Sequence, residues 1–333
     1  MKYMNKLLFI SVLFMSVMIA ISSTNWVTLW VSLEINLMAF IPLITKSQDK
    51  NSSEAMMIYF LVQSMGSMIL LMTIMINSMI LYPINLIHEC LTGFMMGSLL
   101  LKLGAAPFHS WFPEMMNKMN WLNCMILMSW QKITPMIIIN SIINQNHKMI
   151  YFSIILSVLL GAISGLNQTS MRKIMAFSSI NHLGWMLTLM ISQNIWIKYL
   201  IIYSCMIIIT CMFFNYYDIY YLNQFIYYSS SMSEKFSYVF ILLSMGGLPP
   251  FLGFLPKWLV IQSAMYSNMM SLLVILVMTS IITLFYYLRL MSFLLLNYTS
   301  SMKWLNNNKP NFMILTLIIN FNLFLPLISS FNF

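Results

Sequence analysis

The chain consists of successive apolar stretches, each about as long as a helix that crosses a lipid bilayer. Such a helix needs about 20 mainly apolar residues. Of the 333 residues, 60% are hydrophobic and 7% are charged, whereas a soluble domain carries about 25% charged residues. The sequence has no polar stretch long enough to form a soluble domain. It therefore predicts an all-α polytopic membrane protein in which residues 1–333 form a single membrane domain.

Eleven transmembrane helices are predicted at this length. Their ranges are 4–21, 25–45, 55–81, 87–104, 121–143, 149–167, 173–192, 195–215, 236–263, 268–296 and 311–331. Lys and Arg in the loops orient the array, because they accumulate on the side of a membrane that is not translocated. If the N-terminus and every second loop share one side, the opposite side holds only Lys148 and Lys198. We therefore expect the N-terminus on the inner side and the C-terminus on the outer side.

The ten basic residues on the expected inner side are Lys2, Lys6, Lys46, Lys50, Lys118, Arg172, Lys173, Lys235, Lys303 and Lys309. Because they flank apolar segments, the net charge of +9 is read as a topology signal, and nucleic-acid binding is not expected.

A short motif occurs twice in the chain. Residues 104–113 read GAAPFHSWFP and residues 247–256 read GLPPFLGFLP, so that both fit G-x-x-P-F-x-x-aromatic-x-P at an offset of 143 residues. The copies fall in the fourth and ninth predicted spans, which cross the membrane in opposite senses because they are an odd number of spans apart. This layout predicts inverted repeats over about 1–145 and 146–297, followed by a C-terminal helix at about 298–333.

Each copy of the motif also predicts a broken helix. Proline removes a backbone donor and clashes with the preceding turn, and glycine adds flexibility. Breaks at matching positions of two repeats are the best sequence pointer to an ion path. The alternative is that both breaks only end helices at the membrane surface. The residues expected to break the helices are Pro107, Pro113, Gly247, Pro250 and Pro256.

Charged residues occur inside apolar stretches at Glu34, Lys102, Lys132 and Lys257. A charge at the bilayer centre costs about 2.5–3.5 kcal/mol on insertion scales, and its usual uses are ion paths, proton relays and counter-ions. Burial favours the neutral form of lysine, and a nearby carboxylate favours the charged form. A lysine that gains and loses the company of Glu34 is therefore a candidate proton switch. The alternatives are static ion pairs and side chains that extend to the membrane surface.

Other polar residues have less defined roles. His182 is a candidate relay between lysines because an imidazole both donates and accepts protons, but a lone histidine in a helix is also a common structural group. Glu114 occupies the repeat position equivalent to Lys257, and Arg289 is expected to reach the membrane surface. The four cysteines do not have the spacing of metal ligands, and we expect them to be buried thiols. They are Cys90, Cys124, Cys205 and Cys211.

Five segments, taken together, resemble the proton-pumping NADH:ubiquinone oxidoreductase of mitochondria, respiratory complex I. They are LEINLMAFIP around Glu34, LLKLGAAPFHSWFPE around Lys102, SWQKITP around Lys132, MRKIMAFSSINHLGW around His182, and GGLPPFLGFLPKW around Lys257. They occur in the order of its antiporter-like membrane-arm subunit 2 and cover most of the chain. The 36 methionines suit an AT-rich, insect-like mitochondrial genome.

The resemblance implies an antiporter-like fold with two inverted five-helix repeats in the mitochondrial inner membrane. It places proton transfer at Glu34, Lys102, Lys132, Lys257 and His182. It implies no cofactor in this chain, because NADH, FMN, the iron–sulfur clusters and ubiquinone belong to other subunits. The expected partners are other membrane-arm subunits of complex I, including antiporter-like neighbours, and membrane lipids such as cardiolipin.

Three functions are therefore open. The first is a proton-translocating subunit of complex I, with a Glu34 switch and a row of the three lysines across the bilayer midplane. The second is a stand-alone cation/proton antiporter of the same fold. The third is a mainly structural spacer of the membrane arm, in which the polar residues are a relic.

Overall fold

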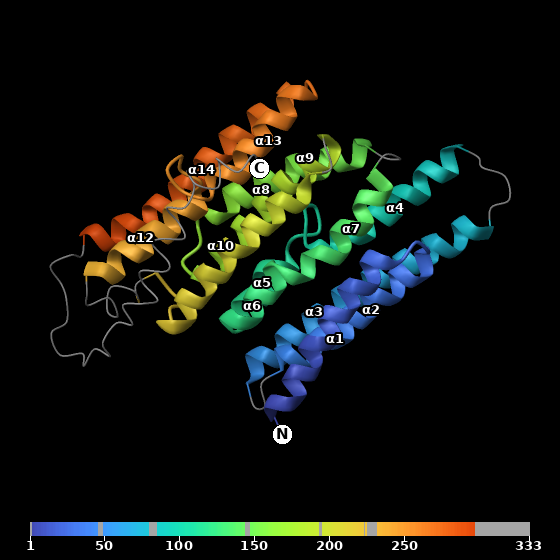
Figure 1. The fold of residues 1–333 in the computed structure, drawn as a ribbon, viewed down its shortest axis with the longest axis horizontal. Coiled ribbons are helices and arrows are strands. Elements are labelled where there is room, and N and C mark those ends of the chain that lie inside the picture. The colour runs from blue at the N-terminus through green and yellow to red at the C-terminus, as the bar shows by residue number, and fades with distance from the viewer. Residues whose placement is uncertain are drawn as a thin grey trace. The chain divides into compact units, whose positions relative to one another are not determined.

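The computed structural model describes residues 2–45, 49–79, 85–143, 147–192, 195–222, 224 and 232–296, and almost all of them are helical or in turns. The chain divides into two compact units, Met1–Ser157 and Val158–Phe333, which are treated separately below. Figure 1 shows the helices of each unit along the chain. The predicted eleventh span at 311–331 and the C-terminal helix from 298 lie outside the described residues.

The first unit begins with three long helices that pack along one another, α1 (Lys2–Ser22), α2 (Trp26–Ile44) and α3 (Lys50–Met79) (Figure 1). The next helix, α4 (Asn85–Leu103), packs on α3, and the short α5 (Trp111–Lys118) follows after a non-helical link. The predicted ranges 25–45 and 87–104 therefore match α2 and α4 to within two residues at each end.

The predicted span at 121–143 is not one continuous helix. It consists of α6 (Trp121–Met128), a 3₁₀ turn η1 (Trp130–Lys132) and α7 (Ile133–Ile142). The cause is Pro135, which has no N–H for the carbonyl of Gln131 and whose ring clashes with that carbonyl. The 3₁₀ turn begins at Trp130, two residues after Met128, and Lys132 is thereby placed at the interruption.

α8 (His147–Gly165) carries the chain from the first unit into the second. The second unit then contains α9 (Met171–Ser192), α10 (Trp196–Tyr216), α12 (Met232–Gly246), α13 (Phe254–Tyr266) and α14 (Met270–Leu296). α9 is its core helix, since 94% of its most apolar 18 residues are buried, and α10 and α13 pack against it.

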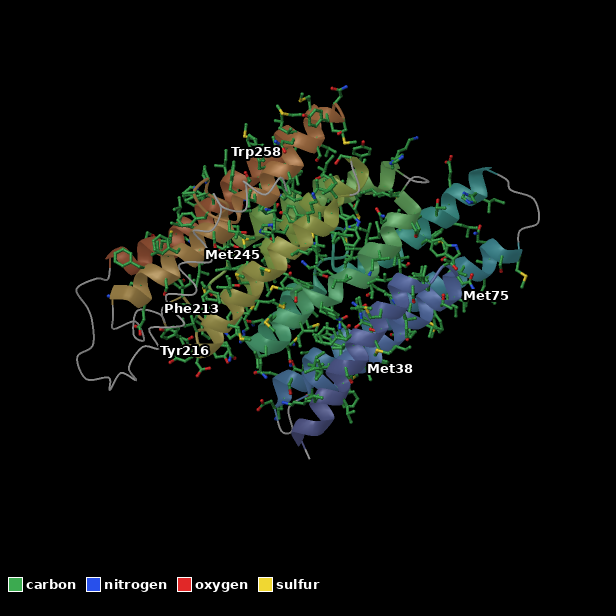
Figure 2. The ribbon with its side chains drawn as sticks, in the orientation of Figure 1. Met38, Met75, Phe213, Tyr216, Met245 and Trp258 are labelled. Atoms are coloured by element: carbon green, nitrogen blue, oxygen red, sulfur yellow. The ribbon has the colours of Figure 1, made fainter. Side chains whose placement is uncertain are left out.

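Seven helical segments of the described residues are long and apolar enough to cross a bilayer, and α1 adds a shorter apolar helix at Lys6–Ser22. Large apolar side chains on α2 and α3 face outward, as Met38 (59% exposed) and Met75 (48% exposed) illustrate in Figure 2. Side chains of this kind suit a lipid environment. The chain is a multi-pass, all-helical membrane protein, so that the predicted fold class is confirmed, whereas the number of eleven spans stays a prediction. The seven segments are Trp26–Ile44, Lys50–Met79, Trp121–Ile142, His147–Gly165, Met171–Ser192, Trp196–Tyr216 and Met270–Ser292.

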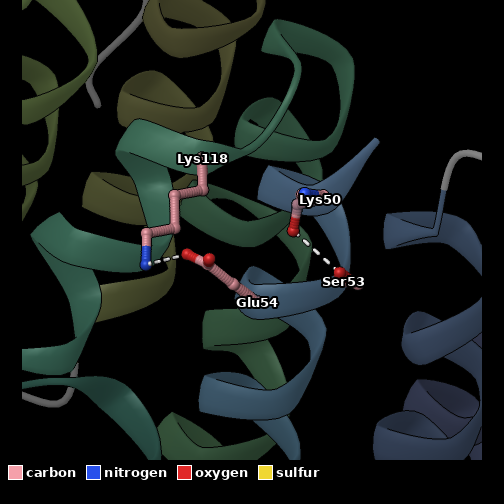
Figure 3. Close-up of polar contacts among 4 residues, drawn as sticks. All are labelled: Lys50, Ser53, Glu54 and Lys118. Atoms are coloured by element: carbon pink, nitrogen blue, oxygen red, sulfur yellow. Dashed lines mark hydrogen bonds and ion pairs between the residues drawn. The ribbon is translucent and has the colours of Figure 1, made fainter. Parts of the chain in front are cut away.

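One end of the first unit carries an exposed ion pair. Nζ of Lys118, in the last turn of α5, lies 2.8 Å from Oε2 of Glu54 in the first turns of α3 (Figure 3). Next to it, the hydroxyl of Ser53 donates to the carbonyl of Lys50 at 2.7 Å. Both charged side chains of the pair are partly exposed, at 32% for Lys118 and 58% for Glu54, which suits an aqueous end of the helix bundle.

Candidate functional site

Two helices are interrupted at equivalent residues of the repeated motif. α4 ends at Leu103 and α5 begins at Trp111, while α12 ends at Gly246 and α13 begins at Phe254. The two ends are 143 residues apart, and so are the two beginnings. The motif therefore gives the same local structure in each unit.

Glycine ends both interrupted helices. Gly104 has φ +68° and Gly247 has φ +75°, a region that favours glycine because it has no Cβ. In the first copy, the N–H of Ala105 donates to the carbonyl of Leu100 at 3.0 Å, and the N–H of Gly104 donates to that of Leu101 at 3.2 Å. These two bonds form a Schellman motif, which satisfies carbonyls at a helix end.

The second copy repeats this pair of bonds. The N–H of Leu248 donates to the carbonyl of Leu243 at 3.4 Å, and the N–H of Gly247 donates to that of Ser244 at 3.1 Å. The four prolines have different positions. Pro107 and Pro250 lie in the non-helical links, whereas the other two are the third residues of the following helices, where a missing N–H leaves no helical bond unmade. These two are Pro113 and Pro256.

Lys102 and Lys132 line the same cavity in the first unit. Lys102 is in the last turn of α4 and is 6% exposed, and Lys132 ends η1 and is 2% exposed. The cavity has a volume of about 20 Å³. A space of about 10–15 Å³ on this measure holds one water molecule. Both lysines therefore line a water-sized space among apolar helices.

Hydrogen bonds of polar side chains connect the helices that line this cavity. Nδ2 of Asn36 on α2 donates to Oγ1 of Thr134 on α7 at 3.1 Å. The hydroxyl of Tyr59 on α3 donates to Oε1 of Gln131 at 3.3 Å. Nε2 of Gln63, also on α3, donates to the backbone carbonyl of Lys102 at 3.0 Å. These bonds fix α2 and α3 against the two interrupted segments that carry the lysines.

Glu34 lies near this group without forming an ion pair within it. It is half-buried on α2, and its charge attracts that of Lys102. The carboxylate of Glu54, by contrast, lies 2.8 Å from Nζ of Lys118. Oε1 of Glu34 is buried and has no hydrogen-bond partner among the described residues. Glu34 and Lys102 thus interact electrostatically across a gap.

Lys257 caps an interrupted helix in the second unit. Its side chain is 6% exposed, and Nζ donates to the carbonyl of Gly246, the last residue of α12, at 2.7 Å. A helix C-terminus carries partial negative charge, which favours a cation there. Nζ also lies 6.0 Å from the ring centroid of Trp185 on α9. Glu114, at the equivalent position of the first copy, is exposed and has no such role.

His182 lies one helical turn before Trp185 on α9 and is 3% exposed. Its Nδ1 is 2.7 Å from the hydroxyl of Tyr199 on α10, and its ring centroid is 4.9 Å from that of Tyr203. The hydroxyl of Tyr203 is hydrogen-bonded in turn to Ser179. The structure therefore brings Lys102 and Lys132 together in one unit and surrounds His182 with hydroxyl groups in the other.

The sequence matches the family described as NADH:quinone oxidoreductase/Mrp antiporter, transmembrane, over residues 23–283. NADH-ubiquinone oxidoreductase chain 2 of Anopheles gambiae is 46% identical, over 96% of this chain and 95% of its own length. The protein of the same name from Locusta migratoria is 41% identical, over 94% of this chain and 92% of its own. The chain belongs to the NADH-ubiquinone oxidoreductase chain 2 family. The predicted resemblance is thereby confirmed.

Solved structures show the same fold at lower identity. A chain of respiratory complex I from Thermus thermophilus has a TM-score of 0.82 at 20% identity, covering 97% of this chain and 79% of its own. A chain of the Mrp complex from Dietzia sp. has a TM-score of 0.70 at 18% identity, covering 85% of this chain and 59% of its own. The fold of the chain 2 family is therefore shared with both complexes.

Sequence reasoning missed the polar residues that hold the cavity of this chain 2 family member. They are Asn36, Tyr59, Gln63, Gln131 and Thr134. Two of them could have been found from the sequence, because they lie beside predicted site residues. Asn36 follows Glu34 by two residues, and Gln131 directly precedes Lys132.

The outcome differs for two further single-residue expectations, one for Arg289 and one for Cys90. Arg289 donates to the carbonyls of Leu166 and Gln168 just beyond α8, and its expected position near the membrane surface stays a prediction. Cys90 is exposed on α4 rather than buried, whereas Cys124 and Cys211 are buried as expected.

Proposed function

We propose that this chain is a proton-translocating core membrane subunit of the NADH:ubiquinone oxidoreductase complex in the mitochondrial inner membrane. The observation that carries the proposal is the pair of buried lysines, Lys102 and Lys132, beside one water-sized polar cavity. A buried ionisable side chain within a membrane is costly unless it has a use. The names of the relatives, NADH-ubiquinone oxidoreductase chain 2, support the same function.

In the first unit, Glu34 acts as the switch. When its carboxylate approaches Lys102, the opposite charge favours the protonated amine, and when it withdraws, burial favours the neutral amine. The released proton passes from Nζ of Lys102 to the neutral amine of Lys132 across the cavity. The gap between Glu34 and Lys102 in this structure corresponds to the state in which the switch is not closed.

In the second unit, Lys257 and His182 are the corresponding proton carriers. The carbonyl of Gly246 accepts from Nζ of Lys257 and takes the place that a carboxylate has in the first unit. His182 exchanges a proton through Nδ1 with the hydroxyl of Tyr199. The expectation that one row joins all of these residues across the membrane stays a prediction.

Redox chemistry takes place in other subunits on this proposal, so that this chain binds neither NADH, FMN, iron–sulfur clusters nor ubiquinone. Its partners are the other membrane-arm subunits of the complex, including antiporter-like neighbours, and lipids such as cardiolipin. The N-terminus faces the matrix and the C-terminus faces the intermembrane space. The distribution of Lys and Arg between alternate loops supports this orientation.

The test is a Lys132→Met variant in the assembled complex. We expect coupled turnover to fall about 100-fold or more, because a positioned proton-transfer group contributes about 10² to 10⁴ in rate. The measurements are NADH:ubiquinone reductase activity and protons moved per NADH in proteoliposomes. The matched control is Lys118→Met, which removes an exposed lysine and leaves both values unchanged. Normal turnover and a normal proton ratio for Lys132→Met would instead support the structural-spacer function.

A stand-alone cation/proton antiporter is the second candidate, and the shared fold with the Mrp complex favours it. The two candidates differ in what the isolated chain does. Cation-dependent proton exchange by the purified chain in liposomes would contradict the proposal that its proton movement requires the redox subunits.

A further inference from the structure

We propose that Asn36 and Gln131 position one water molecule that carries the proton between Lys102 and Lys132. This inference rests on the proposed function, since it assigns the intermediate carrier of the same step. It makes the two amides positioning residues, because they act on the water and exchange no proton with the lysines themselves.

The two amides line the same cavity and come from different helices. Asn36 belongs to α2, and Gln131 belongs to η1, one turn before Thr134 of α7. Residues three positions apart on a helix share a face. Since Asn36 is bonded to Thr134, the Asn36 amide and the Gln131 amide meet at the same part of the cavity.

One end of each amide is fixed and the other end is free. Nδ2 of Asn36 is bonded to Thr134, and Oε1 of Gln131 is bonded to Tyr59. Oδ1 of Asn36 and Nε2 of Gln131 are buried, and neither has a hydrogen-bond partner within the described part of the chain. The free ends are thus one acceptor and one donor. Rotation of the Gln131 amide would exchange its free donor for a free acceptor, and the site would stay polar.

A water molecule satisfies both free ends at once. Its oxygen accepts from Nε2 of Gln131, and one of its hydrogens points to Oδ1 of Asn36. Buried polar groups without partners are costly, and buried waters are found where they make about three hydrogen bonds to such groups. The volume of about 20 Å³ fits one water of this kind. The lysine amines supply the remaining hydrogen bonds of the water.

The proton step is balanced. The ammonium of Lys102 donates a proton to the water oxygen while the water gives one of its own protons to the neutral amine of Lys132. One N–H bond breaks at Lys102, one N–H bond forms at Lys132, and the water is regenerated. No electrons are transferred, and the positive charge moves from one lysine to the other.

The experiment uses Gln131→Met and Asn36→Leu in the assembled complex. Each removes a polar end and keeps a side chain of similar size. We expect coupled turnover to fall about 3- to 10-fold, as for the loss of a neutral hydrogen bond. We also expect the ratio of the rates in H2O and D2O to change, which a purely structural role would not cause. The matched control is Asn140→Leu on α7. It removes a half-buried amide whose buried Oδ1 has no partner among the described residues, and Asn140 does not line the cavity.

The result that overturns the inference is an unchanged rate and an unchanged isotope effect in both variants. If Lys132→Met loses proton movement in the same preparation, the proposed function stands and only the water carrier fails. If the variants do not assemble, a high-resolution map of the unsubstituted complex decides the question. It should show a water within hydrogen-bond distance of both amides, and a dry cavity would overturn the inference.

Discussion

Gly247 is fitted closely to the amine that it borders. Its φ of +75° is a conformation that side chains rarely adopt. A Cβ at this position would lie 2.8 Å from Nζ of Lys257, which is closer than carbon and nitrogen atoms approach without moving. The neighbouring Gly246 is different, since a Cβ there would meet its nearest atom at 3.8 Å. Two adjacent glycines thus differ sharply in what they tolerate.

We therefore expect Gly247→Ala to lower the stability of the complex by about 1–3 kcal/mol, the usual cost of a strained backbone conformation. It should also displace the lysine amine from its carbonyl and reduce proton movement. The measurements are the thermal unfolding midpoint and protons moved per NADH. Gly246→Ala is the matched control, and equal effects of the two substitutions would contradict the assigned contact.

At the scale of the element, the interruption at Trp130–Lys132 sets the direction of the Lys132 side chain. A continuous helix over residues 121–142 would rotate Lys132 relative to Gln131 and the cavity wall, because a 3₁₀ turn has three residues per turn instead of 3.6. On the proposed function, the proline that causes the interruption serves to place Lys132, although a proline inside a helix costs about 3 kcal/mol.

Pro135→Ala should restore an α-helical bond to the carbonyl of Gln131. The variant is expected to be at least as stable as the unsubstituted protein and to lose coupled turnover about tenfold or more, because a displacement of about 1 Å can cost 10²-fold in rate. Stability and turnover of the assembled complex are measured together. Pro42→Ala, which removes a proline inside α2, is the control. Unchanged turnover in Pro135→Ala would show that the interruption is not needed.

At the scale of the whole molecule, the described helices give a membrane protein whose aqueous ends are marked by charge. The exposed ion pair of Lys118 and Glu54 lies at the end of α3 and α5 that the loop charges assign to the inner side. Lys198, near the start of α10, is assigned to the outer side. The proposed orientation rests on these assignments and on the predicted number of crossings between them.

Accessibility to a thiol reagent tests this orientation. Lys118→Cys should react with a membrane-impermeant maleimide added from the matrix side, and Lys198→Cys should react from the intermembrane-space side. Cys90 is exposed and is replaced by serine in both variants. The measurement is mass-shift labelling in intact mitochondria-derived vesicles of each orientation. Labelling of both positions from the same side would contradict the proposed topology.

The sequence predicted the helices well because apolar length is a local property. The predicted range 173–192 matches α9, and the break in each repeat begins at the first residue of the motif, Gly104 or Gly247. The walls of the cavity could not be predicted in this way. The bond between Asn36 and Thr134 joins residues 98 positions apart, and nothing local to either residue indicates the other. The interruption before Ile133 depends on one proline in an otherwise regular apolar helix.

The contact of Lys257 with Gly246 has a consequence for how this protein varies. Its acceptor is a main-chain oxygen, which every amino acid supplies. No single codon change can delete it, so a complete substitution scan of α12 would find no position at which the loss of a side chain abolishes the acceptor. The carbonyl of Gly246 therefore persists whatever side chain the residue carries, and only a change in the path of the backbone can remove it as the partner of Lys257.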